Sequence, residues 1–236
     1  MDLLEDTTIS LNHWYYFTKY RILKKYLRFV PSHDRLIDIG AGSAIFSRLF
    51  LQDTAFVSAD AVDINYDKDK EEETVSNDKR LSFYTKMDRY DCDLILLMDL
   101  LEHIENDKSF LKDVVKKSEK GTVYFITVPA FNFLFSAHDI YLKHFRRYNK
   151  NALRSVVEEA GLEPVKIFYS FYLLFPIVAL IRIVKKCFTF FNLAPKSEMK
   201  DHSKIVNFIL STIHKIEYHI SNPFFGLTCV CIARKR

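Results

Sequence analysis

The sequence is poor in glycine and cysteine, and its net charge is small. Its 236 residues include 5 glycines and 4 cysteines, and no two cysteines form a CxxC pair. The cysteines therefore predict neither a zinc site nor a disulfide framework. The formal net charge of +4 is too small to predict a nucleic-acid partner. No secretory signal is recognised, so we expect a reducing, cytoplasmic compartment.

A long hydrophobic run of the kind that crosses a membrane is also missing. The uncharged run at 167–181 contains Pro176 and is shorter than the ~18–20 residues that span a bilayer. Beyond Pro176 the pattern becomes helical, with Arg182, Lys185 and Lys186 on one face and apolar side chains on much of the other. This pattern is typical of a helix that lies in a membrane interface. An ordinary core helix with a solvated stripe is the alternative.

Aromatic residues, in contrast, are abundant. The sequence has 21 Phe and 13 Tyr, and hydrophobic residues make up 49% of it, which is the composition of a globular protein. Strand-like apolar runs alternate with helical patterns, which predicts an α/β fold with parallel strands and crossover helices. The predicted strands are 35–39, 55–62, 81–85, 93–98, 122–128, 164–172 and 227–233; the predicted helices are 10–29, 43–51, 108–118 and 149–160, and 67–80 is a predicted charged loop.

Two of the few glycines stand in the most informative segment of the chain. An apolar run ends in Asp38, and Gly40 and Gly42 follow before Ser43 and a helical pattern. Glycine permits the dihedral angles of a tight turn and lets a ligand approach the bare backbone. Amide hydrogens and the positive end of the helix dipole would face that ligand. The segment therefore predicts a nucleotide-like ligand at a helix N-terminus.

A dinucleotide-binding fingerprint would need a third glycine, and Ile45 stands in its place. This counts against a nicotinamide-dependent oxidoreductase or epimerase, which we keep as an alternative. The second predicted strand ends at Asp63, about twenty residues after Gly42, where a carboxylate accepts hydrogen bonds from ribose hydroxyls. One alternative is that Asp63 only caps the end of the strand; another is that Asp60 makes the ribose contact instead.

Together these features resemble the class I S-adenosylmethionine (SAM) methyltransferases. The resemblance is carried by the acid-x-Gly-x-Gly turn, by Asp63, by the buried run into Leu101-Glu102-His103, and by Gly161 before the last strands. It implies SAM as cofactor and a Rossmann-like, seven-stranded, mostly parallel sheet. Members of the family often have glycine at the position of Ala44. Further motifs resemble a bacterial branch associated with surface-glycan or lipid-linked pathways: 13–16, 128–130, 136–139 and 144–148.

The resemblance also implies roles for individual residues. The predicted SAM-binding residues are Asp38, Gly40, Gly42, Asp63 and Asp99. The predicted catalytic bases are His103 and His138, because imidazole titrates near neutral pH; a structural hydrogen bond is the alternative for His103. The residues predicted to bind the acceptor are Trp14, Tyr15, His144, Arg147 and Tyr148.

The segment from Asp99 to His103 also has a second, less favoured interpretation as part of a divalent metal site. Asp99, Glu102 and His103, with His138, resemble the carboxylate and histidine arrangement of small-RNA 2′-O-methyltransferases. A metal there would lower the pKa of an acceptor hydroxyl. Because the Leu-Glu-His segment is also common without a metal, we predict no metal ligands.

The predicted function is methyl transfer from SAM, to oxygen more readily than to carbon or nitrogen. The expected acceptor is a small metabolite, a glycan or a lipid-linked intermediate, and a non-catalytic membrane adaptor is a further alternative. We expect one domain over 1–236: a lid helix (1–30), a SAM-binding core (31–170), an apolar helical insertion (171–221) and a final strand (222–236). Residues 171–191 are the predicted peripheral contact with the inner face of the cytoplasmic membrane.

Overall fold

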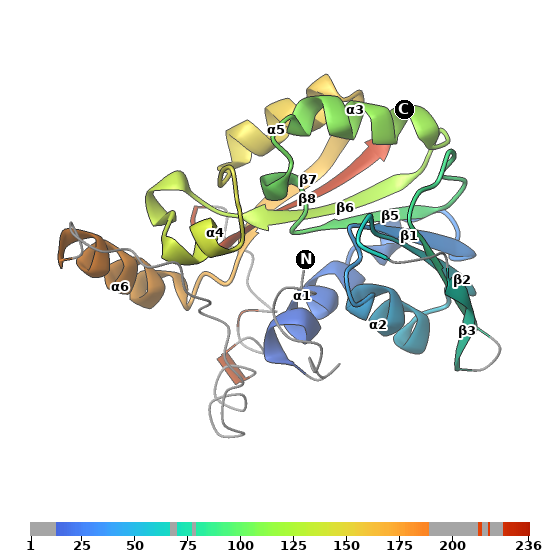
Figure 1. Ribbon diagram of the computed structural model, residues 1–236, viewed down its shortest axis with the longest axis horizontal. Helices are drawn as coiled ribbons and strands as arrows, with labels where there is room; N and C mark the ends of the chain where they lie inside the picture. The colour runs from blue at the N-terminus through green and yellow to red at the C-terminus, as the bar shows by residue number, and fades with distance from the viewer. Residues whose placement is uncertain (1–12, 67–69, 77–78, 189–211, 214–216, 218–223) are drawn as a thin grey trace.

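In the computed structural model, a sheet of eight strands lies between helices on both of its faces (Figure 1). The structure describes residues 13–66, 70–76, 79–188, 212–213, 217 and 224–236. In sheet order the strands are β3 (Lys70–Ser76), β4 (Lys79–Tyr84), β2 (Ser58–Val62), β1 (Arg35–Ile39), β5 (Leu94–Met98), β6 (Val123–Pro129), β8 (Thr228–Lys235) and β7 (Leu162–Ser170).

The central strands are parallel and the last strand in the chain is not. Strands β4, β2, β1, β5 and β6 pair in parallel, whereas β8 lies antiparallel between β6 and β7. Strands buried on both faces have continuous apolar sequences, as the fully buried β5 shows. The predicted α/β class, the mostly parallel sheet and the final strand are confirmed.

Each face of the sheet has its own apolar layer. Helices α1 (Trp14–Lys24) and α2 (Ile45–Asp53) cover one face, and α3 (Asp107–Lys117) and α5 (Lys150–Glu159) cover the other (Figure 1). Aromatic rings fill much of the first layer; the ring of Phe50, for example, lies 5.0 Å from Tyr20 and 6.3 Å from Phe56. This packing accounts for part of the aromatic excess.

The first helix, α1, is shorter than the helix predicted at 10–29. Helix α1 ends at Lys24, and a separate 3₁₀ turn, η2 (Leu27–Phe29), follows. Between them, Tyr26 leaves helical geometry, and its ring packs 5.2 Å from that of Phe168 on β7. Tertiary packing therefore breaks the helix before Pro31 does. The predicted residues 10–12 lie outside the described part.

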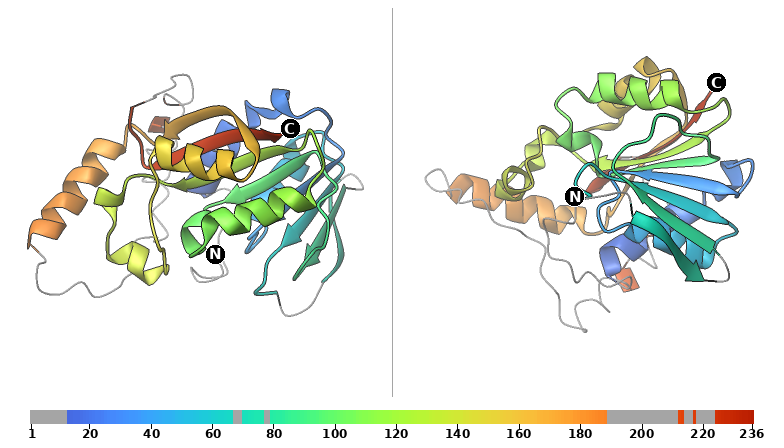
Figure 2. Two further views of the ribbon diagram at one scale, coloured as in Figure 1. Left: turned by 90° about the horizontal axis from the view of Figure 1, so that it is seen from above. Right: turned by 45° about the vertical axis from the view of Figure 1, so that its right-hand side comes forward.

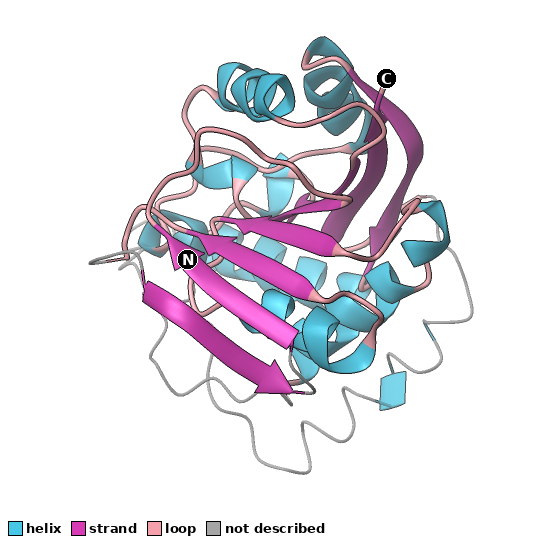
Figure 3. Ribbon diagram, turned by 90° about the vertical axis from the view of Figure 1, so that its right-hand side faces the viewer, coloured by secondary structure: helices cyan, strands magenta, loops and turns pink. Residues whose placement is uncertain are grey.

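The predicted charged loop at 67–80 is wrong in part, because Lys70–Ser76 forms β3. This strand pairs antiparallel with β4 at the edge of the sheet (Figure 3). An edge strand needs only one hydrogen-bonded neighbour, and charged side chains suit it because they discourage pairing with other chains. The sheet therefore has one strand more than the seven predicted.

The insertion after β7 begins with α6 (Phe175–Phe188), which extends away from the sheet near α4 (Ala137–Tyr141) and η4 (Asn132–Leu134) (Figure 2). Most of 189–223 lies outside the described residues. Among the helices that the structure describes, none has the length and hydropathy needed to span a membrane. The predicted basic stripe of α6 needs one correction. The Arg182 side chain is only 12% exposed and donates to the Leu134 carbonyl at 2.9 Å, so it points inward.

The chain turns sharply where three strands end. Asp99 after β5, Phe131 after β6 and Phe171 after β7 have φ of 51°, 60° and 58°. The left-handed region is strained for residues other than glycine, and such strain concentrates at functional sites. Since β5, β6 and β7 run in the same direction, all three turns lie at the carboxyl edge of the sheet.

Candidate functional site

A cavity lies at this carboxyl edge, where open α/β sheets bind their ligands. Its wall includes α1, the loops after β1, β5 and β6, and α6. It brings together seven of the predicted site residues: Tyr15, Asp38, Gly40, Asp99, His138, His144 and Arg147. The other five predicted site residues are not in its wall: Trp14, Gly42, Asp63, His103 and Tyr148.

The turn after β1 presents bare backbone to the cavity. Gly40 has φ of +73°, and a Cβ on it would lie 2.6 Å from Cδ1 of Leu100. The Gly40 amide donates to the Val62 carbonyl at 2.7 Å, which fixes the turn to β2. Asp38 is buried and accepts a hydrogen bond from Ser47 Oγ at 2.9 Å, which ties the turn to α2.

Ala44 lies where the resemblance implies that glycine is common, and its backbone geometry is one that glycine adopts easily. It has φ of 58° and directly precedes α2. Within five residues, Gly40, Gly42 and Ala44 all adopt left-handed geometry. Alanine completes the turn with its side chain fully buried in the core, at some cost in backbone strain.

Asp63 braces the same turn from β2. Its Oδ2 accepts a hydrogen bond from the Gly42 amide at 2.9 Å, and its Oδ1 accepts two from Asn65, from the backbone and side-chain nitrogens, each at 2.9 Å. The predicted ribose contact is untested. What the structure shows is that Asp63 fixes the Gly42 amide of the glycine turn.

Asp99 is held by a buried lysine that we did not predict. Lys19 forms an ion pair with Asp99 Oδ2, and its side chain is only 1% exposed. Tyr15 donates to the same oxygen at 3.1 Å, and Thr127 donates to Oδ1 at 3.1 Å. Burial and then Asp99 raise the pKa of Tyr15 well above its usual value. The spacing of Tyr15 and Lys19, four residues apart on one helix face, was the available signal.

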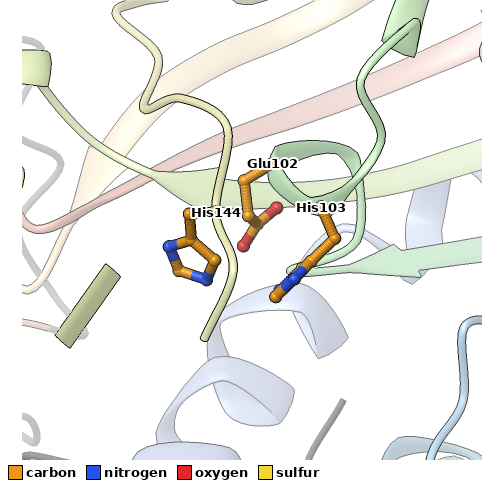
Figure 4. A group of neighbouring side chains, drawn as sticks. All are labelled: Glu102, His103 and His144. Atoms are coloured by element: carbon orange, nitrogen blue, oxygen red, sulfur yellow. The ribbon is translucent and has the colours of Figure 1, made fainter. Parts of the chain in front are cut away.

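The buried Glu102 and the partly buried His103 and His144 point toward one another at the wall of the cavity (Figure 4). One potential ligand atom from each lies within 4.8 Å of the others. The rings of His103 and His144 are edge to face, with centroids 4.5 Å apart. Burial, then Asp99, raises the pKa of Glu102 well above its usual value. Burial, then His144, lowers the pKa of His103 to about 3, against weaker opposite effects of Asp99 and the Leu142 backbone.

Asp139 is a second residue that we did not predict as part of the site, and it holds two residues of the cavity wall, His144 and Arg147. It is fully buried and accepts from His144 Nδ1 at 2.8 Å and from Arg147 Nε and Nη2 at 2.7 and 2.9 Å. Burial opposes the charge, but the hydrogen bond from His144 and the Arg147 guanidinium outweigh it and lower the pKa of Asp139. The capping pattern of Ser136 and Asp139 was a sequence signal for its position, although not for its partners.

Two residues predicted to bind the acceptor have other contacts. The Tyr148 hydroxyl donates to Asp107 Oδ2 at 2.6 Å and is buried between α3 and the sheet edge. The Trp14 ring packs edge to face against Phe171, with centroids 6.0 Å apart. The structure therefore places Tyr148 and Trp14 in supporting positions behind the cavity wall.

Comparison with known protein families identifies the chain. Residues 13–167 match the family described as "Methyltransferase domain". The match covers more than half of the chain and includes the glycine turn and Asp99. The chain belongs to this family. It is a SAM-dependent methyltransferase, and the oxidoreductase, epimerase and adaptor alternatives are not supported. A comparison with curated proteins gives no significant match.

Solved structures show the same fold for the methyltransferase. A SAM-dependent methyltransferase from Archaeoglobus fulgidus aligns over 92% of this chain and 93% of its own, with a TM-score of 0.52 and 19% identity. One from Clostridium acetobutylicum aligns over 99% and 95%, with a TM-score of 0.50 and 11% identity. Phosphoethanolamine N-methyltransferase 2 from Haemonchus contortus, in complex with SAM, aligns over 99% and 59%, with a TM-score of 0.55 and 15% identity.

Proposed function

We propose that this methyltransferase moves the methyl group of SAM to an oxygen of an acceptor bound in the same cavity. One observation carries the proposal: a single cavity joins the glycine turn to a polar wall that contains His138, His144 and Arg182. Cofactor and acceptor would therefore meet without leaving the site. SAM carries its own leaving group, so alignment of the two reactants would supply much of the rate enhancement.

The turn end of the cavity fits the cofactor. Asp38 and the backbone of Gly40 and Ala41 line it and would hold the amino-acid part of SAM. Asp63 Oδ2 accepts one hydrogen bond and keeps a lone pair for a ribose hydroxyl. Tyr15 contributes an aromatic ring to the wall, and such rings favour a sulfonium cation. When bound, SAM supplies an activated methyl group on positively charged sulfur.

The acceptor end offers a base for a hydroxyl proton. We assign this role to His138, which is in the cavity wall. His103 is less suited, because a pKa lowered to about 3 by burial makes its imidazole a weak base. A hydroxyl on the acceptor would lose its proton to His138 as its oxygen attacks the methyl group.

The walls on the acceptor side favour an anionic, lipid-linked acceptor such as a phosphate-linked glycan. Arg182 and the apolar Val178 and Leu227 line this end. Arg182 shares Asp139 with Arg147, at 3.8 Å from Oδ2, so one carboxylate faces two guanidinium groups here. The two arginines that follow β6 in the chain contribute less free charge to this end, because Arg147 is paired with Asp139 and Arg146 with Asp107. Val178 and Arg182 both belong to α6, so this helix connects the acceptor end of the cavity to the molecular surface.

We further propose that α6 rests on the inner face of the cytoplasmic membrane. Leu180 and Ile177 are 63% and 60% exposed, and Ile181, Ile183 and Val184 are exposed as well. Lys185 adds an exposed positive charge to the same helix. Apolar side chains beside a cation are the features of helices that insert into an anionic lipid interface.

The test uses the full chain and SAM labelled in its methyl group. Incubation with a bacterial membrane-lipid extract should label a lipid-soluble product at an oxygen, and His138→Asn should slow this reaction. The matched control is His33→Asn, which changes a histidine that packs edge to face against Phe56 outside the cavity wall. Label confined to a water-soluble extract would contradict the lipid-linked acceptor, and label on nitrogen or carbon would contradict O-methylation.

A further inference from the structure

The cluster of Glu102, His103 and His144 contains acceptors that no described donor satisfies. Glu102 is fully buried, and neither of its carboxylate oxygens has a hydrogen-bond partner among the described residues. The same holds for Nε2 of His103 and Nε2 of His144. Burial of a polar atom without a partner is unfavourable. A cation between these atoms would satisfy all of them at once.

The contact of His144 with Asp139 supports this reading. Nδ1 of His144 lies 2.8 Å from Asp139 Oδ1, and Asp139 also accepts a hydrogen bond from Arg147. Because Nδ1 is engaged with Asp139, Nε2 is the ring nitrogen left to face Glu102 and His103. A carboxylate that orients a histidine in this way is the usual support for a metal-binding histidine.

The nearby cations of the protein are used elsewhere. Lys19 pairs with Asp99, and Arg147 makes two hydrogen bonds to Asp139. Neither is hydrogen-bonded to Glu102, whose oxygens have no partner among the described residues. Because Asp99 is already paired with Lys19, it is a poor ligand, although the sequence resemblance placed it in the metal set with His138.

We propose that Glu102, His103 and His144 bind one divalent first-row transition cation. Two imidazoles and one carboxylate suit Mn²⁺, Fe²⁺, Co²⁺ or Zn²⁺ better than Mg²⁺ or Ca²⁺, which prefer all-oxygen sites. The three residues leave coordination positions open. Glu102 and His144 are also part of the cavity wall, so the open positions face the cavity.

The role of the cation rests on the proposed function. A hydroxyl oxygen of the acceptor that occupies an open position would be fixed in place, and its pKa would fall because the cation stabilises the alkoxide. His138 would then take the proton from this oxygen. The proposed ligands therefore differ from the set that the sequence resemblance implied. His144 replaces His138, and Asp99 is not a ligand because it is paired with Lys19.

The test measures binding of Co²⁺ to the full chain after removal of metals with a chelator. Wild type should bind one Co²⁺ per chain, with a visible d–d absorption band. Glu102→Gln and His144→Asn should abolish this stoichiometric binding. Asp139→Asn keeps all three ligands but removes the support of His144, and it should weaken binding by about 10–100-fold. His138→Asn is the matched control, a histidine of the same cavity outside the cluster, and should bind Co²⁺ as wild type does.

Two outcomes would overturn the proposal: no saturable Co²⁺, Mn²⁺ or Zn²⁺ binding by wild type, or binding that survives both ligand substitutions. Circular dichroism reports whether each variant is folded, and the wild-type titration decides the question even if a variant is not. SAM binding is measured separately by calorimetry. A chain that binds SAM but no cation refutes the metal site and leaves the proposed function standing, whereas the reverse result refutes the proposed function.

Discussion

At Gly40, backbone geometry and packing demand the same residue. Its φ is +73°, and Leu100 occupies the position that a Cβ would need. Gly42 and Ala44 are also left-handed, so the turn combines two glycines with one strained alanine. The sequence alone predicted this turn because glycine spacing is a local signal. It did not predict the contact with Leu100, which lies in a distant loop.

Substitution of Gly40 by alanine should therefore weaken SAM binding. The left-handed backbone costs about 1–2 kcal/mol for a residue with a Cβ, and the contact at 2.6 Å forces Leu100 or the turn to move. We expect the Kd for SAM, measured by calorimetry, to rise by at least about tenfold, which corresponds to 1.4 kcal/mol.

Gly121 provides the matched control for this substitution. It has φ of +89°, and a Cβ on it would meet nothing within 4 Å. Gly121→Ala should lower the free energy of unfolding by about 1 kcal/mol through backbone strain and leave the Kd for SAM unchanged. Equal SAM affinities for the Gly40 and Gly121 variants would contradict the role given to Gly40.

Asp139 concentrates several interactions in one buried carboxylate. Asp139→Asn should lower the free energy of unfolding by about 3–5 kcal/mol, because the buried Arg147 guanidinium loses its counter-charge. Urea denaturation at neutral pH measures the change. The exposed pair of Lys108 and Glu159, with Nζ and Oε1 2.8 Å apart, is the comparison. Glu159→Gln should leave the urea midpoint nearly unchanged. If both variants lost a similar free energy of unfolding, the larger stabilisation that we assign to the buried Asp139 would be refuted.

At the scale of single elements, α1 is fastened to the cavity edge by the ion pair of Lys19 and Asp99. The helix has no side-chain cap at its N-terminus, so packing and this pair hold it in place. Lys19→Met should lower the free energy of unfolding by about 3 kcal/mol, since it leaves Asp99 charged and largely buried. Urea denaturation measures this loss.

The double variant Lys19→Met with Asp99→Asn separates charge from packing. Removal of both charges should restore part of the stability lost in Lys19→Met, as expected for two residues in direct contact. If the single variant were as stable as wild type, the ion pair would contribute nothing to the attachment of α1.

The proposed contact with the membrane is made by helix α6. Leu180→Glu with Ile177→Glu should reduce cosedimentation with vesicles that contain anionic lipid, because it replaces two apolar side chains that are 63% and 60% exposed by carboxylates. Val57→Glu is the control: Val57 is 50% exposed and precedes β2 at the amino edge of the sheet. Wild-type protein that fails to sediment with such vesicles would contradict this proposal.

The elements differ in how well their sequences predict them. Strand β5 and helix α5 were predictable, since a continuous apolar run and a periodic pattern between Asn149 and Gly161 report local structure directly. Strand β3 was missed because charged edge residues look like a loop. The inward turn of Arg182 was missed because its partner, the Leu134 carbonyl, lies on another element.

At the scale of the whole molecule, the parallel order of β2, β1, β5 and β6 brings the functional strand ends to one edge. The sequence predicted this edge and seven residues of the cavity wall, because strand order in an α/β sheet places carboxyl ends together. It did not predict which buried groups satisfy one another. The pairs of Asp139 with His144 and of Asp99 with Lys19 join different segments, and their arrangement follows only from the folded chain.

The most direct test of the account is a calorimetric titration of the full chain with SAM and, separately, with NAD. We predict one SAM per chain with a Kd in the micromolar range, no detectable binding of NAD, and a weaker affinity for SAM in Gly40→Ala but not in Gly121→Ala. Failure to bind SAM at millimolar concentration, or tighter binding of NAD than of SAM, would contradict the assignment of this cavity to a methyl-transfer reaction.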